Sequence, residues 1–122
     1  MATPPCPRLR PLGDCAWIVE FGSVIDEATR ERVMGFADAL ARARASWPGI
    51  AECVPAYTTV TVHFRADEDS DLAGDAAQAL LELARTAPSL ARPGRRWRLP
   101  VCFDDAEFAP DLEAVAQARA LA

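Results

Sequence analysis

The sequence predicts an α+β fold, a two-layer sandwich over residues 8–88, on three observations. Stretches that alternate apolar and polar residues come in two pairs, as strands do, and each pair precedes a stretch with apolar residues at helical spacing. The chain is 51% apolar, enough to bury a core. The order β-β-α-β-β-α lets both helices cover one face of a four-stranded, largely antiparallel sheet, and it leaves the other face open.

The first strand pair and helix occupy residues 8–46. The turn dipeptide Gly13-Asp14 separates two extended stretches and predicts a β-hairpin. Asp26 then offers an N-cap, and apolar residues follow at steps of three and four, which predicts an amphipathic helix. A Pro-Gly pair ends that helix.

The second half repeats this order. A strand candidate at residues 50–56 contains Pro55, which cannot donate a hydrogen bond in the middle of a sheet. Residues 57–64 alternate Val and Phe with Thr and His, the composition of a half-buried sheet surface. An acidic stretch at residues 67–71 leads into a second predicted helix over residues 72–87.

The remaining chain predicts part of a second domain. Residues 89–95 are rich in Pro, Gly and Arg and are expected to be a linker. Residues 96–122 are expected to hold a strand at 97–103 and a helix that begins near Pro110, where proline suits the first helical turn. We expect this second domain to be incomplete.

Composition excludes several classes of function. Thirteen basic residues against eighteen acidic ones give a net charge of −5, which argues against nucleic-acid binding. No apolar run is long enough for a membrane span, and the first residues lack the pattern of an export signal. We therefore expect a cytoplasmic protein without a membrane partner. The six glycines are scattered and form no phosphate-binding loop.

The cysteines give no sign of a metal site. Cys6, Cys15, Cys53 and Cys102 contain no C-x-x-C pair, and His63 has no ligand spacing to any of them. Three of these cysteines lie in apolar, strand-like runs, so we expect buried free thiols rather than disulfides.

The candidate functional residues lie on the last predicted strand of the sheet and its turn. Thr59, Thr61 and His63 share one face, and hydroxyl, imidazole and carboxylate groups could form a catalytic triad. A lone histidine on a strand is more often an interface residue. Tyr57 either fixes the hairpin or touches a partner, and the sequence leaves both open. We name these four as candidate partner contacts and assign no catalytic or cofactor-binding residue.

One basic cluster allows two interpretations. Arg92, Arg95, Arg96 and Arg98 surround Trp97 and could grip a phosphate or carboxylate. The alternative, which we favour, is a solvated linker beside a strand that buries Trp97.

Five segments carry a family resemblance. They are Leu12-Gly13-Asp14 with Val19-Glu20-Phe21-Gly22, then Pro48-Gly49-Ile50-Ala51-Glu52-Cys53-Val54-Pro55-Ala56-Tyr57, Thr58-Thr59-Val60-Thr61-Val62-His63-Phe64, Leu99-Pro100-Val101-Cys102-Phe103 and Phe108-Ala109-Pro110-Asp111-Leu112-Glu113-Ala114-Val115-Ala116. In this order they resemble the N-terminal half of the family of KipI and the 5-oxoprolinase B subunit, also called allophanate hydrolase subunit 1 or carboxyltransferase subdomain C/D.

The resemblance implies a DCoH-like N-terminal domain followed by a cyclophilin-like β-barrel, of which residues 96–122 would be the opening. Subunits of this family act with partner subunits in the ATP-dependent cleavage of 5-oxoproline to glutamate. Residues 104–107 depart from a glycine-rich stretch of the family, and the motifs of the family's barrel domain are absent from residues 1–122. ATP is therefore expected to bind the full complex and not this chain alone.

Three hypotheses follow from the resemblance. The first is an N-terminal part of a 5-oxoprolinase-type hydrolase subunit, inactive alone, whose partner is another subunit of the complex. The second is a protein-binding regulatory module similar to a relative that inhibits a sporulation sensor histidine kinase. The third is a fragment without function, whose exposed strand at residues 97–103 would favour self-association. Homo-oligomerisation, the true substrate and whether the chain itself is an enzyme stay open.

Overall fold

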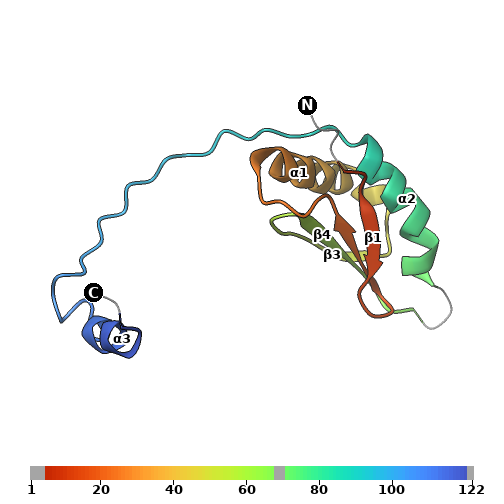
Figure 1. The fold of residues 1–122 in the computed structure, drawn as a ribbon. Coiled ribbons are helices and arrows are strands. Elements are labelled where there is room, and N and C mark those ends of the chain that lie inside the picture. Colours follow the sequence, from red (N-terminus) through yellow and green to blue (C-terminus); the bar gives the residue numbers. More distant parts are fainter. Residues whose placement is uncertain (1–4, 68–70, 121–122) are drawn as a thin grey trace. The chain divides into compact units, whose positions relative to one another are not determined.

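A four-stranded antiparallel sheet organises the first of the two units into which the chain divides. The units are Met1–Arg92 and Pro93–Ala122. The computed structural model describes residues 5–67 and 71–120, so most of the predicted acidic stretch at residues 67–71 lies outside the described residues. The sheet and the helices confirm the predicted α+β class (Figure 1).

The strands follow the spatial order β1-β2-β4-β3, and every neighbouring pair is antiparallel. Their bounds are Arg8–Pro11 for β1, Ala16–Glu20 for β2, Ile50–Pro55 for β3 and Thr59–Phe64 for β4. Both hairpins that the sequence predicts are present, and β2 pairs with β4 in the middle of the sheet. The two strand prolines, Pro11 and Pro55, lie in the edge strands, where the missing N–H is tolerated.

Two long helices belong to this unit, and each begins at an aspartate. They are α1 (Glu27–Arg42), which a 3₁₀ turn η1 (Arg44–Ser46) follows, and α2 (Leu72–Thr86). The side chain of Asp26 accepts a hydrogen bond from the Thr29 amide at 2.8 Å, and that of Asp71 from the Gly74 amide at 2.9 Å. These bonds satisfy amides that have no partner inside the helix, which is why the helices start there.

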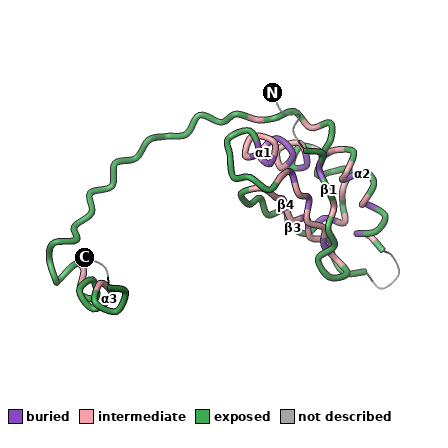
Figure 2. Tube along the Cα trace, viewed as in Figure 1, coloured by how far each residue is buried: buried purple, intermediate pink, exposed green. Residues whose placement is uncertain are grey.

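The core lies between the sheet and both helices, as the sequence predicts. Its members come from β2, β3, β4 and the loop after β2, and from the inner faces of α1 and α2 (Figure 2). The largest fully buried side chains are Phe21, Phe36, Leu40, Ile50, Leu80, Val19, Val33, Val60 and Val62. The indole Nε1 of Trp17 donates to the carbonyl oxygen of Ala73 at 2.7 Å, which joins β2 to the start of α2.

A β-bulge changes which way the first residues of β3 face. Ile50 lies opposite Phe64, but the register shifts after it, and Glu52 lies opposite His63. Residues two apart normally share a face, whereas the extra residue of the bulge turns Ile50 into the core and Glu52 to the open face.

The second unit differs from the sequence prediction. Residues 97–103 form no strand, and Trp97 is 68% exposed, so the prediction that a strand buries this ring is wrong. An alternating apolar stretch becomes a strand only when a neighbouring strand pairs its amides and carbonyls, and the described residues supply none here. The helix α3 spans Leu112–Ala118 and begins after Pro110, a little later than predicted.

All four cysteines are free, as expected, but they are not the buried thiols that the sequence predicted. Cys6 and Cys102 are exposed, while Cys15 and Cys53 are half-buried. Cys102 lies in the segment that forms no strand. No helix in the described parts of the chain has both the length and the apolar character needed to cross a membrane.

Candidate interaction surface

The open face of the sheet is the surface on which three of the four candidate residues meet. Thr59, Thr61 and His63 alternate along β4 with Val60, Val62 and Phe64, so the former point away from the helices. All three are half-buried by their neighbours on adjacent strands. By strand alternation and register the same face carries Arg8, Arg10, Ile18, Glu20, Glu52 and Val54.

His63 lies directly opposite Glu52 on β3. Directly opposed residues of antiparallel strands are close enough for their side chains to interact. Among the described residues, however, no hydrogen bond joins His63 to Glu52 or Thr61, so the structure does not assemble a catalytic triad. The arrangement suits contact with another molecule better than nucleophilic chemistry.

Sequence reasoning missed Glu52, although a signal for it exists. Ile50 and Cys53 are both apolar and both on the helix side of the sheet, but three positions separate them. An odd spacing cannot keep two residues on one face of a regular strand, so it indicates a bulge between them.

Tyr57 lies at the turn between β3 and β4 and is 75% exposed. The turn is closed by the backbone, since the Ala56 amide donates to the Thr59 carbonyl oxygen at 2.8 Å. The structure therefore favours contact with a partner over fixing of the hairpin. Exposed tyrosines are common anchors in protein interfaces because a large ring and a hydroxyl are presented at low entropic cost.

Two further apolar side chains lie at the same end of the sheet. The Phe21 amide donates to the Thr58 carbonyl oxygen at 2.9 Å, which ties the loop after β2 to the Tyr57 turn. In that loop Val24 is 60% and Ile25 is 69% exposed. Sequence reasoning missed these two residues. The sign that they could be exposed was that two β-branched apolar residues stand together outside any alternating stretch. We call Val24, Ile25 and Tyr57 the apolar end of the sheet.

Charge on the open face is mixed. Arg8 and Arg10 lie on β1, and Arg10 forms an ion pair with Glu20 at 3.4 Å. Glu52 lies at the opposite edge, on β3. Such a face offers no concentrated positive field for a nucleic acid, and it suits a protein surface with charges of both signs.

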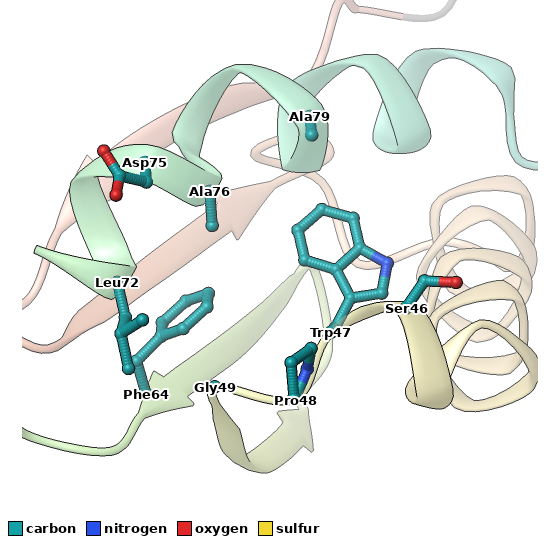
Figure 3. A pocket seen from close by; sticks show the side chains of 9 residues that line it. All are labelled: Ser46, Trp47, Pro48, Gly49, Phe64, Leu72, Asp75, Ala76 and Ala79. Carbon is teal, nitrogen blue, oxygen red and sulfur yellow. The ribbon is translucent and has the colours of Figure 1, made fainter. Parts of the chain in front are cut away.

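A separate hollow of about 400 Å³ lies between the end of η1, the start of β3 and α2 (Figure 3). Trp47 stands in its middle, with Phe64 and Leu72 on one side and Ala79 above. Its lining contains one charged side chain, that of Asp75, and no Arg. A triphosphate needs basic side chains or a cradle of amides, so these residues do not fit ATP.

The remaining reactive groups of the described residues form no catalytic centre. Burial raises the pKa of the Cys53 thiol, an effect that the nearby Arg44 guanidinium opposes, so the thiol stays protonated and is a poor nucleophile. The described residues hold no group of three or more His, Cys, Asp or Glu side chains suited to a metal ion.

Two arginines of the basic cluster make contacts within their own units. Arg92 forms an ion pair with Asp38 at 3.2 Å, while the Arg95 guanidinium lies 5.1 Å from the centre of the Trp97 ring. Arg92 belongs to the first unit and Arg95 to the second. We therefore assign these side chains to local contacts.

A family model and a curated relative indicate the same family. The family model of the carboxyltransferase domain, subdomain C and D, matches residues 7–122. The B subunit of 5-oxoprolinase from Bacillus subtilis (strain 168) is 31% identical over 125 residues, which cover 93% of this chain and 50% of the relative. The chain thus spans about half the length of that relative.

The comparison with solved structures agrees on the fold. The crystal structure of a conserved uncharacterised protein from Pyrococcus horikoshii superposes with a TM-score of 0.51 at 26% identity. The match covers 63% of this chain and 34% of the archaeal one.

Proposed function

The chain belongs to the family of the carboxyltransferase domain, subdomain C and D, and on this premise we propose that it is the N-terminal part of a 5-oxoprolinase-type subunit. The observation that carries the proposal is the match to the Bacillus subtilis 5-oxoprolinase protein over 93% of the chain. The complex would cleave 5-oxoproline to glutamate with ATP. This chain would contribute a docking surface and be inactive alone.

The geometry supports a docking role. The open sheet face groups charged, polar and apolar side chains, and its described residues assemble no nucleophile and base. The hollow beside Trp47 has no basic side chain for a triphosphate. In this proposal ATP binds the full complex, which supplies the phosphate chemistry, and the sheet face binds a partner subunit. A cytoplasmic location and an assembly with more than one copy stay predictions.

We extend the proposal to the fold. The first unit would be a DCoH-like domain, and residues 96–122 would open a cyclophilin-like barrel. Supporting this, Trp97, Leu99, Val101 and Phe103 alternate and are all more than 60% exposed, as expected of a segment that would form a strand only beside the neighbouring strands of a barrel.

The direct test is an assay of glutamate formation from 5-oxoproline and ATP. We expect no turnover from the purified chain alone, and none from the chain mixed with the partner subunits of a 5-oxoprolinase complex. The same partners with a full-length 5-oxoprolinase B subunit serve as the positive control. ATP-dependent turnover by the isolated chain would contradict the proposal.

A second function is favoured by one observation, the exposed apolar end of the sheet. Val24, Ile25 and Tyr57 could bind a helical protein surface, as in a module that inhibits a sensor histidine kinase. The test is autophosphorylation of a sensor kinase with the chain and with its Tyr57→Ala variant. Inhibition that the variant loses supports this function, and equal phosphorylation with and without the chain contradicts it.

A further inference from the structure

The segment that follows α2 is attached to α1 instead of leaving the domain directly. Residues 88–92, which we call the strap, pass along α1 before the chain leaves the first unit (Figure 1). Backbone and side-chain contacts hold the strap at three points, described below. The segment belongs entirely to the first unit.

The first attachment is a close approach of two backbones at Gly35. A Cβ atom at this position would overlap the carbonyl oxygen of Pro88 and lie 3.0 Å from its carbonyl carbon and 3.1 Å from the Cα of Ser89. These are backbone atoms and cannot rotate aside. Glycine in the middle of a helix is unfavourable, so its presence here is explained by the space that the strap needs.

The other two attachments are polar. The Leu90 amide donates to the carbonyl oxygen of Glu31 in α1 at 2.9 Å. Two residues further on, Arg92 pairs with Asp38 at 3.2 Å, and Asp38 also pairs with Arg42 at 2.7 Å. The Asp38 side chain is half-buried while both arginines are exposed, so the pair with Arg92 helps to hold the strap but adds less than the backbone contacts do.

We propose that the strap is a docked element of the first unit, held in the notch at Gly35, and that the free tether to the second unit begins at Pro93. Residues 89–92 of the linker predicted over residues 89–95 would then belong to the strap, and only residues 93–95 would remain as linker. If the strap detached from α1, residues 88–92 would become part of the tether and make it longer. The surface of α1 that the strap covers would then be exposed. Docking of the strap therefore limits the length of the tether between the first unit and the residues that follow Arg92. This inference does not depend on the proposed function.

Amide hydrogen exchange by NMR tests this on the full chain. We expect the Leu90 amide to exchange at least about tenfold more slowly than the amides of Ser89 and Ala91, because opening must break its bond. The Gly35→Ala variant should lose this difference to within about twofold, while core amides such as that of Val60 stay protected. Gly94→Ala is the matched control, since a Cβ at Gly94 meets nothing within 4 Å.

The outcomes separate clearly. Equal exchange of Leu90, Ser89 and Ala91 in the unaltered chain overturns the proposal, and so does a folded Gly35→Ala protein that keeps the Leu90 protection. If the Val60 amide also loses its protection from exchange in Gly35→Ala, the whole domain has opened and this variant does not test the strap. The Asp38→Ala variant then provides the test. Unchanged Leu90 protection in Asp38→Ala contradicts the proposal, and a drop of about twofold or more supports it.

Discussion

Several elements of the first unit are joined by single side chains that bond to backbone carbonyls. The Trp17 indole reaches Ala73 at the start of α2. Arg32 on α1 donates to the carbonyl oxygens of Phe21 and Pro5, both at 2.8 Å, and its guanidinium lies 5.4 Å from the Phe21 ring centre. A carbonyl oxygen has two lone pairs and can accept a side-chain hydrogen bond beside a backbone one, so each of these bonds satisfies a polar side chain while it joins two elements.

The Trp17 bond gives a stability prediction. Trp17→Phe keeps an aromatic ring but removes the Nε1–H that bonds Ala73 at 2.7 Å. We expect the free energy of unfolding to fall by about 1–2 kcal/mol, the usual cost of a lost partly buried hydrogen bond. Urea denaturation measures it. Tyr57→Phe on the exposed turn is the control and should change stability by less than about 0.5 kcal/mol.

The N-cap of α1 gives a pH prediction. The hydrogen bond from the Thr29 amide lowers the pKa of the Asp26 carboxyl below its ordinary value of 3.8. A carboxyl with a lowered pKa stabilises the folded state above its ordinary pKa, and this contribution is lost as the pH falls through the folded value.

We therefore expect the unaltered chain to lose more stability than Asp26→Asn when the pH is lowered from about 6 to about 3, since asparagine still caps but does not titrate. Thermal unfolding at the two pH values measures the difference. Glu27, whose pKa the ion pair with Arg30 also lowers, remains in both proteins and cancels. Identical losses in the two proteins would contradict this role of Asp26.

At the scale of elements, local pattern determined what could be predicted. The hairpins, α1 and α2 follow from alternation, helical spacing and the aspartate caps, which are all local in sequence. The pairing of β2 with β4 and the register that sets Glu52 opposite His63 depend on contacts between distant segments, and the odd spacing of Ile50 and Cys53 was the only local sign of the bulge. The strand at residues 97–103 was wrongly predicted because its alternating pattern can be read locally, whereas a strand also needs a neighbouring strand to pair with, which the local pattern does not reveal.

The packing of α2 can be compared with that of α3 by one matched pair of substitutions. Leu80 on α2 is fully buried, whereas Leu112 on α3 is 49% exposed. We expect Leu80→Ala to lower the free energy of unfolding by about 2–5 kcal/mol, through lost burial and a cavity.

Leu112→Ala, the control, should change the free energy of unfolding by less than about 0.5 kcal/mol. Denaturant titration followed by circular dichroism measures both. A similar loss for the two variants would show that α3 packs in a core as α2 does.

At the scale of the whole molecule, the sequence predicted the layers but only part of the surface. Thr59, Thr61 and His63 were placed on one face by alternation along a single strand, and the structure agrees. Val24 and Ile25 lie at the same end of the sheet as Tyr57 because β2 pairs with β4 and the Phe21 amide bonds to Thr58, and no local pattern reveals this. A surface that several loops share can be recognised only when the fold brings them together.

The central claim is that the open sheet face and its apolar end bind a partner, while the helices cover the opposite face. The most direct measurement is an NMR titration of the ¹⁵N-labelled chain with an unlabelled partner subunit of a 5-oxoprolinase complex. We expect signal loss and shifts at Tyr57, Thr61 and His63, and none at Glu82 and Arg85 on the exposed side of α2. Changes confined to the α2 residues would contradict the claim.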